Sequence, residues 1–474
     1  MDAVNRLFRA LFQPVTGPLS RWVNRICLVL LFVLGILHWG YFLNWGSVPF
    51  DLHDWTETGP YYSFLRQALL THQLPLHITS PLVTTDRYLA RPDTLFSPQA
   101  FLLYFFEPGP FTLVNVLILY SIGFIGLLLL QKRYALSPAA FSGLFLLINF
   151  NGHITDHLAV GHSEWVGYFL LPFFALLVLQ ALDKTKIDWT WVLLMALVLF
   201  FLTLQGAFHM FLWCLIFLLA LGLFYPRYVR LVFAAILSGV ALSLLRLLPP
   251  TVEFLSGGPR FISGFPSITD LLAALVVLKY PAEAASGPFK SLGWWEVDTY
   301  IGFLGLVFIA CFGVFTTWRK HSRELVLLAP VSLVAFLSIG RIYSFIAQLP
   351  LPLLDSERIT SRFLILPLVV LAVVGSIRFQ EFLINRGSLG IREGLLYLGL
   401  LVLMGHDLFQ HSRIWRVTNM YALFKSTPVD IRATVSNHPD PLYYGAIILG
   451  LMGSLASLAF LVLKAYQERK RRVV

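Results

Sequence analysis

Charged residues are scarce in this chain of 474 residues. Asp, Glu, Lys and Arg together make up 13% of it, whereas 57% of it is hydrophobic. Soluble domains usually carry about 25% charged residues. Too few charges are present to cover a surface that faces water, which excludes an ordinary soluble protein. The mean hydropathy of +0.75 agrees with a chain whose solvent is largely lipid.

Cysteine is equally rare, which excludes two further classes of protein. The three cysteines, Cys27, Cys214 and Cys311, each lie inside an apolar run. The absence of CxxC pairs and of Cys/His zinc spacing argues against a disulfide framework and against a zinc-binding domain. The net charge of +10 could indicate a nucleic-acid partner. Its concentration in short loops and at the two ends favours the membrane surface instead, so we expect no nucleic acid.

Long apolar runs are what the sequence has in quantity. A helix that crosses a membrane needs about 20 mostly apolar residues. We therefore predict an all-α polytopic membrane protein with about twelve transmembrane helices. The candidate spans lie near 26–43, 111–130, 136–150, 166–182, 189–206, 208–224, 230–248, 299–317, 325–340, 363–379, 394–410 and 443–463.

The distribution of basic residues predicts the orientation. If the N-terminus is cytoplasmic, the segments on that side hold 21 of the 35 basic and 7 of the 25 acidic side chains. Those segments are 1–25, 131–135, 183–188, 225–230, 318–324, 378–393 and 464–474. Because cytoplasmic loops carry the excess of Lys and Arg, both termini are expected inside.

This orientation divides the chain into three parts. Residues 1–25 are either an amphipathic helix on the cytoplasmic leaflet or an unstructured basic tail. Residues 26–463 form the transmembrane domain, and residues 464–474 form a basic tail attracted to anionic membrane lipid. The long loops all fall on the outer face, where we expect any chemistry. They are 44–110, which includes an expected amphipathic helix from Pro60 to Leu70, and 249–298, 341–362 and 411–442.

Acidic residues follow the first predicted span directly, in the string Asp51-Leu52-His53-Asp54-Trp55-Thr56-Glu57. Carboxylates held at a lipid boundary are often functional, and burial there raises their pKa values, which suits a general base. We predict Asp51 and Asp54 as catalytic residues, with His53 and Glu57 in contact with the substrate. The alternative is a solvated cap on the helix that follows.

Arginines recur at two further places on the outer face. Arg87, Arg91 and Asp93 belong to the string Asp86 to Asp93, which mixes acidic and basic residues. This suits an arginine pair that grips a phosphate while an aspartate holds a sugar or metal, or a loop locked by ion pairs. Arg358 and Arg362 enter the tenth predicted span four residues apart. They could hold a lipid phosphate at a helix N-terminus, or anchor the helix by snorkelling.

Histidines and acids cluster between the third and fourth predicted spans, in residues 151–165. His153, Asp156 and His157 resemble the H-x-x-E-H metal motif with Asp in place of Glu, and a helix would put both imidazoles on one face. They are candidate metal ligands, while His162 and Glu164 are candidate substrate contacts. The alternative is a set of polar residues that hold the outer loops together. The string from Gly293 to Gly302, with tandem Trp before two acids, suits sugar stacking or anchoring at the membrane interface.

These features together resemble the GT-C superfamily of membrane glycosyltransferases. The resemblance rests on a long first outer loop, an acid just after the first span and many spans. Several local strings resemble its YfhO-type bacterial branch: 96–104, 151–153, 161–165, 171–172, 300–302 and 358–363. The adjacent acid pair seen in many such enzymes is absent, since Asp51 and Asp54 are three apart, so the choice between them stays open.

The resemblance implies an enzyme of the bacterial inner membrane and cell envelope. It would transfer a sugar from a polyprenyl-phosphate donor to a glycan, lipid or protein acceptor at the outer face. An acid of the first outer loop, Asp51 or Asp54, would act as base. Some relatives use a divalent cation and others do not, so a cation stays possible. Two alternatives remain: a non-catalytic subunit or scaffold that binds a membrane-protein partner, and a transporter, although inverted repeats are not evident.

Overall fold

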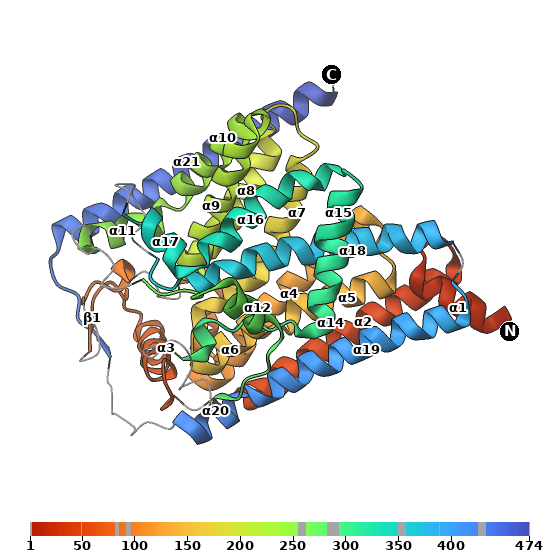
Figure 1. Ribbon diagram of the computed structural model, residues 1–474. Coiled ribbons are helices and arrows are strands. Elements are labelled where there is room, and N and C mark those ends of the chain that lie inside the picture. Colours follow the sequence, from red (N-terminus) through yellow and green to blue (C-terminus); the bar gives the residue numbers. More distant parts are fainter. Residues whose placement is uncertain are drawn as a thin grey trace.

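The computed structural model is almost wholly helical, as Figure 1 shows, and confirms the all-α membrane class predicted from the sequence. It describes residues 2–473 apart from 49, 81–84, 92–95, 255–261, 282–292, 349–356, 388 and 425–432. In the first half of the chain the helices are α1 (Asp2–Phe12), α2 (Pro18–Phe42), α3 (Trp55–Leu70), α4 (Pro108–Tyr134), α5 (Pro138–Asn149), α6 (Gly152–Val160), α7 (Leu171–Ala181), α8 (Trp189–Leu204), α9 (Phe208–Phe224), α10 (Val229–Leu242) and α11 (Leu244–Phe254). In the second half they are α12 (Ile268–Val276), α14 (Gly302–Phe308), α15 (Thr316–Arg319), α16 (Leu328–Leu337), α17 (Gly340–Ile346), α18 (Ile365–Arg386), α19 (Ile391–Ile414), α20 (Val417–Phe424) and α21 (Pro441–Val473).

All twelve predicted apolar segments overlap helices, but fewer of these helices are long enough to span a bilayer. Six described segments pass on length and hydropathy: Pro18–Phe42, Pro108–Tyr134, Ser163–Ala181, Gly302–Arg319, Thr360–Arg386 and Pro441–Arg471. A seventh follows if α9 and the segment Pro226–Leu242, bent by 120° against it, form one span. Others are short: α5 has 12 residues, α8 has 16 and α16 has 10. Apolar runs occur in helices that face lipid and also in shorter helices that the protein itself buries. The number of apolar runs therefore exceeds the number of long spans.

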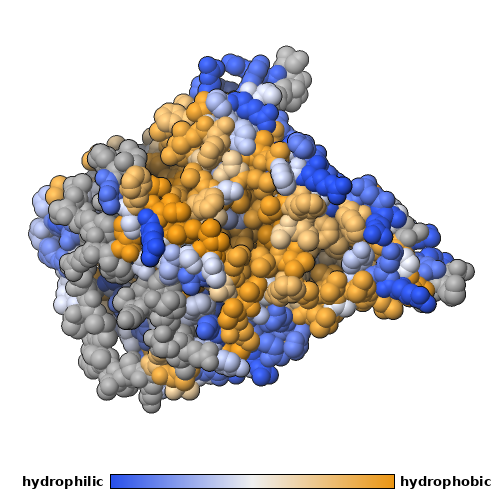
Figure 2. Space-filling model, in the orientation of Figure 1, coloured by the Kyte–Doolittle hydropathy of each residue, from blue (hydrophilic) through white to orange (hydrophobic). Residues whose placement is uncertain are grey.

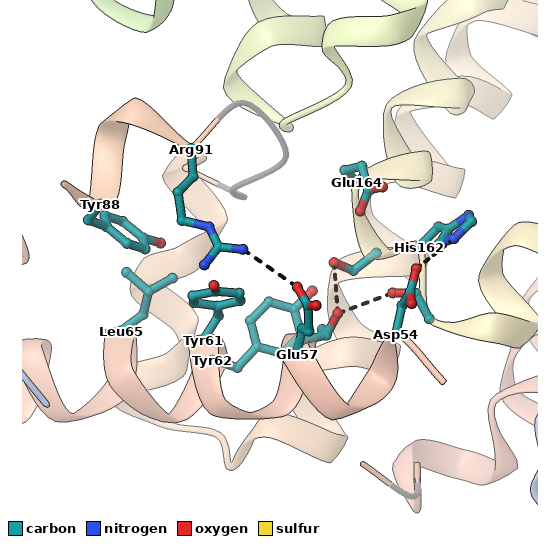
Figure 3. A pocket seen from close by; sticks show the side chains of 12 residues that line it. Asp54, Glu57, Tyr61, Tyr62, Leu65, Tyr88, Arg91, His162 and Glu164 are labelled. Atoms are coloured by element: carbon teal, nitrogen blue, oxygen red, sulfur yellow. Dashed lines mark hydrogen bonds and ion pairs between the residues drawn. The ribbon is translucent and has the colours of Figure 1, made fainter. Parts of the chain in front are cut away.

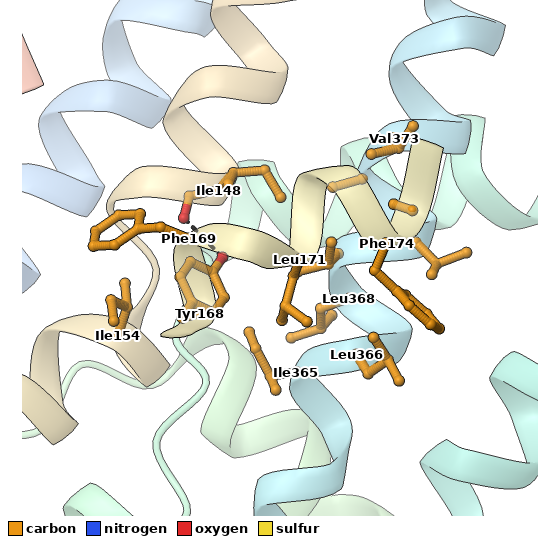
Figure 4. Close-up of a cluster of buried hydrophobic side chains, with 14 of the residues drawn as sticks. Ile148, Ile154, Tyr168, Phe169, Leu171, Phe174, Ile365, Leu366, Leu368 and Val373 are labelled. Carbon is orange, nitrogen blue, oxygen red and sulfur yellow. Dashed lines mark hydrogen bonds between the residues drawn. The ribbon is translucent and has the colours of Figure 1, made fainter. Parts of the chain in front are cut away.

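The interior is built around one helix that other helices surround completely. In Thr360–Arg386 every residue of the apolar 18-residue stretch is buried inside the protein. In Pro441–Arg471 only 22% of the corresponding stretch is buried. Figure 4 shows Ile365, Leu366 and Leu368 of α18 beside Leu171 and Phe174 of α7, with Tyr168 in the segment that leads into α7. The Tyr168 hydroxyl in that segment donates to the Ile148 carbonyl at 2.7 Å, which satisfies its polar group within the apolar core.

A wide apolar surface faces outward around this core. Figure 2 shows hydrophobic residues across the middle of the molecule, with hydrophilic residues gathered toward the ends where the two termini lie. Exposed side chains such as Val29, Leu30 and Leu403 are more than half accessible. Such a surface would be an aggregation hazard in water and is what a lipid environment requires.

The first outer loop folds against distant parts of the chain, at the opposite end of the molecule from the N-terminus (Figure 1). Its expected amphipathic helix is α3, which buries Tyr62, Phe64 and Leu65. Strand β1 (Ile78–Thr79) pairs antiparallel with β2 (Thr434–Val435), in the register Ile78 with Val435 and Thr79 with Thr434. This pairing joins the first outer loop to the segment that precedes α21.

The N-terminal segment contains the helix expected from its apolar spacing. Helix α1 buries Phe8 and Phe12, and it contacts α2, α5 and α19. A Cβ on Gly394 of α19 would lie 2.4 Å from the Phe8 ring, so the glycine allows the two helices to approach closely. Residues 1–25 are therefore anchored to the transmembrane bundle. Their placement on the cytoplasmic side stays a prediction.

Candidate active site

The site forms where the start of α3 meets the end of α6. The Asn151 side chain caps α6 by accepting from the Ile154 amide at 3.4 Å, and Gly161 ends the helix with φ +99°. A Cβ on Gly161 would lie 2.3 Å from the Trp55 amide nitrogen. Glycine is therefore required both by the left-handed turn and by the close approach of the first outer loop. The Asp54 amide completes the contact by donating to the Val160 carbonyl at 3.1 Å.

Asp54 stands at the start of α3 with its carboxylate between two imidazoles. His162 Nε2 lies 2.8 Å from Oδ2, and His53 Nδ1 lies 3.0 Å from Oδ1. His53 adopts a left-handed backbone conformation with φ +41°, uncommon outside glycine, which turns its ring back toward Asp54. The two imidazoles come from segments more than a hundred residues apart, so the tertiary fold creates this arrangement.

The electrostatics of Asp54 differ from the sequence expectation. Burial acts to raise the pKa of Asp54, but the contacts with His162 and His53 outweigh it, so the pKa lies below its ordinary value. Burial also acts to lower the pKa of His53, but the Asp54 carboxylate prevails and the pKa is raised. The expected rise in the pKa of Asp54 was therefore wrong. A sequence shows that an acid is near lipid, but not that imidazoles surround it.

The Asp54 carboxylate borders a cavity of about 140 Å³. Figure 3 shows Arg91 reaching toward Glu57 and Tyr61, with its guanidinium 3.5 Å from the Glu57 carboxylate and 4.2 Å from the centre of the Tyr61 ring. The lining residues are Asp54, Glu57, Thr58, Tyr61, Tyr62, Leu65, Tyr88, Arg91, Gly161, His162, Ser163 and Glu164. The fold thus brings together five of the residues predicted from sequence: Asp54, Glu57, Arg91, His162 and Glu164.

Asp51 and Arg87, predicted in the same loop, lie outside the cavity, and His53 contacts Asp54 without lining the cavity. Asp51 accepts from the Tyr421 hydroxyl at 3.2 Å, on the side of α20. Arg87 forms ion pairs with Asp440 at 2.6 Å and Glu253 at 2.8 Å, which fits the expectation of a loop locked by ion pairs. Asp93, predicted to hold a sugar or metal, lies outside the described residues.

The arginine pair at the tenth predicted span is divided between solvent and interior. The Arg358 side chain is exposed. The Arg362 guanidinium is buried in a bidentate ion pair with Glu296, at 2.7 and 2.8 Å, and lies over the Trp165 ring. The two arginine side chains therefore lie in different surroundings, and their predicted role in holding a phosphate stays a prediction. Glu296 takes the place expected for a lipid phosphate.

The predicted metal motif on α6 is divided in the same way. His153 Nε2 accepts from the Trp165 indole at 2.9 Å, and His157 Nδ1 lies 2.6 Å from His162 Nδ1. Asp156 faces away from both, toward His411. Within the described ranges the metal-ligating groups that do converge are His53–Asp54–His162, His77–Asp86–His438 and Asp156–Asp298–His411.

Several cavity residues were not predicted as site residues. Thr58 donates from its hydroxyl to the Gly161 carbonyl at 3.1 Å, and Ser163 lies 3.5 Å from the same hydroxyl. Tyr61 and Tyr62 were read only as the apolar face of an amphipathic helix. Their neighbours Arg91 and Ser163 come from other segments, and the spacing along α3 carries no signal for them.

Comparison with known proteins supports the fold. No family model matches the chain, and no curated protein matches it. Among solved structures it is similar to the arabinofuranosyltransferase AftD from Mycobacteria, with a TM-score of 0.50 and 14% identity. The similarity covers 85% of this chain and 27% of that one, so the chain spans about a quarter of the length of AftD.

The likeness bears on architecture alone. It shows a fold shared with part of AftD, while the GT-C superfamily stays an implication of the sequence resemblance. The narrower YfhO-type branch stays a prediction, and so do the substrates and partners.

Proposed function

We propose that this protein is a membrane glycosyltransferase that moves a sugar from a polyprenyl-phosphate donor to an acceptor hydroxyl at the outer face of the inner membrane. The observation that carries the proposal is the Asp54 carboxylate, which borders a polar cavity that Arg91 also lines. The fold shared with a mycobacterial arabinofuranosyltransferase supports the reaction class. The place of Asp54, on the loop after the first long apolar helix, agrees with the role the resemblance gives to an acid there.

Asp54 would position the acceptor and receive its proton. With its pKa held low, the carboxylate is ionised at neutral pH and can accept a hydrogen bond from the acceptor hydroxyl. The hydroxyl oxygen attacks the anomeric carbon as the bond from that carbon to the phosphate oxygen breaks. The hydroxyl proton becomes acidic as the new bond forms, so a carboxylate of low pKa can take it late in the step. A single displacement inverts the anomeric configuration.

Arg91 would neutralise the leaving polyprenyl phosphate. Its guanidinium lines the cavity and lies 16% exposed, within reach of a ligand that enters there. Charge-assisted hydrogen bonds from arginine to phosphate are short and strong, and they gain strength as charge develops on the leaving oxygen. Arg91 is preferred over Arg87 and Arg362 because it lines the cavity, and its pair with Glu57, at 3.5 Å, is longer than the carboxylate pairs of those two guanidiniums.

A divalent cation remains compatible with the site. His53, Asp54 and His162 offer ligand atoms that lie within 4.8 Å of one another, and imidazole with carboxylate suits a transition metal. A cation bound there would supply positive charge for the donor phosphate. Asp54 and Arg91 can perform the positioning described above with or without it.

The test measures release of polyprenyl phosphate by the full chain in liposomes, with a panel of short-chain polyprenyl-phosphate pentoses and hexoses and a membrane extract as acceptor. Loss of a general base lowers rates by about 10²- to 10⁴-fold, so Asp54→Asn should fall by that factor while the protein stays folded. Asp51→Asn decides between the two predicted acids and should keep most of the activity. Asp86→Asn, on the exposed surface beside His438, is the matched control.

Three outcomes would overturn the proposal. The first is full activity in a folded Asp54→Asn protein. The second is a wild-type protein that consumes no donor but co-purifies with a large complex, which would favour a non-catalytic subunit. The third is substrate uptake into vesicles without transfer, which would favour a transporter.

A further inference from the structure

A second group of acidic and histidine side chains lies in the interior, apart from the cavity. Asp156 of α6, Asp298 of the segment before α14 and His411 near the end of α19 come from three distant parts of the chain. Their side chains are 0%, 1% and 0% exposed. The proposed glycosyl transfer uses none of them, so their burial requires another explanation.

The charge balance of this group is incomplete. Within the described part of the chain, neither carboxylate forms an ion pair with Lys or Arg, and Asp156 Oδ2 has no hydrogen-bond partner. The Asp156 and Asp298 carboxylates are both buried beside the same imidazole, and two buried negative charges repel each other. Buried charges are normally paired, bound to a metal or neutralised by a proton, so this group needs a metal ion or a shared proton to balance its carboxylates.

The distances between the ligand atoms fit a metal ion. His411 Nε2 lies 3.2 Å from Asp298 Oδ2 and 3.6 Å from Asp156 Oδ1. Ligands about 2.0–2.2 Å from a zinc ion stand roughly 3.3–3.6 Å apart at the tetrahedral angle. Two of the three separations between ligand atoms are therefore close to those of a tetrahedral zinc site, and all three ligand atoms lie within 4.8 Å of one another.

The surrounding residues hold the ligands as a metal site requires. Asp298 accepts from the Trp294 indole at 2.9 Å and from the Tyr300 amide at 2.8 Å. The other imidazole nitrogen, His411 Nδ1, lies 3.5 Å from the Thr155 hydroxyl, and the Tyr300 ring stacks on the imidazole at 4.6 Å. Such outer contacts fix the tautomer and orientation of metal-ligating histidines and carboxylates.

We propose that Asp156, Asp298 and His411 bind a structural divalent transition metal, for which zinc has the best-matched geometry. One imidazole and two carboxylates form a donor set that zinc accepts, with a fourth position left for water. The metal would tie α6 to α19 and to the segment 294–300. Because α6 leads directly into His162, it would also hold one wall of the candidate active site in place. The proposal does not depend on the enzymatic activity.

The test is metal analysis of the full chain, purified in detergent without chelators from cells grown with added zinc. The wild type should contain about one zinc ion per chain, and His411→Gln and Asp298→Asn should lose it. Asp54→Asn and His438→Gln each remove a ligand from one of the other two converging groups, so both should keep the metal. A metal-free wild type, or zinc retained by both interior variants and lost from Asp54→Asn, would overturn the proposal.

If the interior variants fail to fold, a second measurement on the wild type tests whether these three residues bind the metal. X-ray absorption at the zinc edge of the wild type should show nitrogen and oxygen ligands about 2.0–2.1 Å from the metal and no sulfur. A sulfur ligand, or an oxygen shell without imidazole, would contradict the three residues. A wild type that stays free of zinc after refolding or expression with the metal would instead favour a proton shared between the two carboxylates.

Discussion

The candidate active site and the interior cluster contain the same kinds of side chain in opposite surroundings. Asp54 lies between His53 and His162 beside a cavity, and 47% of its side chain is exposed. Asp156 and Asp298 flank His411 at no more than 1% exposure. Both groups adjoin one helix, α6: Asp156 lies in its middle, and its last residue leads to Gly161 and His162.

The difference shows how solvent access decides what a carboxylate can do. A half-exposed carboxylate can exchange its partners for a substrate, because water and imidazole compensate its charge at modest cost. A fully buried one needs a permanent cation, and removal of that cation costs stability. Substitutions beside the cavity should therefore change activity and pH dependence, whereas substitutions in the interior should change stability.

The largest effect is expected for Arg362→Gln, which tests the interior side of this comparison. The change leaves the buried Glu296 carboxylate without its bidentate partner. Breaking a buried ion pair from one side destabilises a protein by about 3–5 kcal/mol, so thermal unfolding in detergent should begin at a clearly lower temperature. Arg358→Gln, four residues earlier and exposed, is the control and should unfold like the wild type. Unchanged stability together with lost donor binding would mean that Arg362 serves the substrate, as the sequence suggested.

Much of the fold could be predicted from the sequence because lipid imposes a simple rule on it. Each of the twelve apolar runs falls on a helix, although shorter helices such as α12 and α20 lie outside these runs, and the orientation inferred from the basic loops stays a prediction. The number of long spans could not be predicted in the same way. Helix α5 is as apolar as α4 but has only 12 residues. The sequence of an apolar segment does not show whether lipid or protein covers that segment.

The candidate site was predictable in its residues but not in their partners. Asp54, His162 and Arg91 were each singled out, yet they lie in three segments, and no spacing relates them. Arg362 and Asp156 show the converse, since local spacing placed each with neighbours four or three residues away. The fold pairs them instead with Glu296 and His411. A helical period indicates which side chains share a face, but tertiary contacts decide which side chain lies opposite.

The next largest effect is expected for Arg91→Gln, which tests whether the cavity binds a phosphate. Hydrogen bonds to a charged group are worth about 1.5–3 kcal/mol, which corresponds to a KM for the polyprenyl-phosphate donor raised about 10- to 100-fold. Thermal stability should change little, because the Arg91–Glu57 pair is 3.5 Å long and Glu57 is half-exposed. Arg87→Gln is the matched control, since it breaks the pairs with Asp440 and Glu253 and should lower stability without a specific effect on KM. A raised KM in Arg87→Gln together with an unchanged KM in Arg91→Gln would place the donor phosphate at Arg87.

The smallest effect concerns His53, and it tests the electrostatics that distinguish the cavity from the interior. Because the Asp54 carboxylate raises the pKa of His53, the contact stabilises the folded state fully below the unfolded pKa of about 6.5. This stabilisation is lost as the pH rises through the higher pKa of the folded state. Both side chains are partly exposed, so the contribution should be only about 0.5–1 kcal/mol.

His53→Gln should accordingly unfold below the wild type at pH 6 and together with it at pH 9, while His72→Gln, exposed at the end of α3, should follow the wild type throughout. A difference that stays constant with pH would show that His53 acts through packing against Trp295, whose ring lies 4.7 Å away. In that case imidazolium charge would not hold the Asp54 carboxylate ionised. The cavity would then resemble the interior cluster, where shape and a permanent cation, and not titration, fix the acids in place.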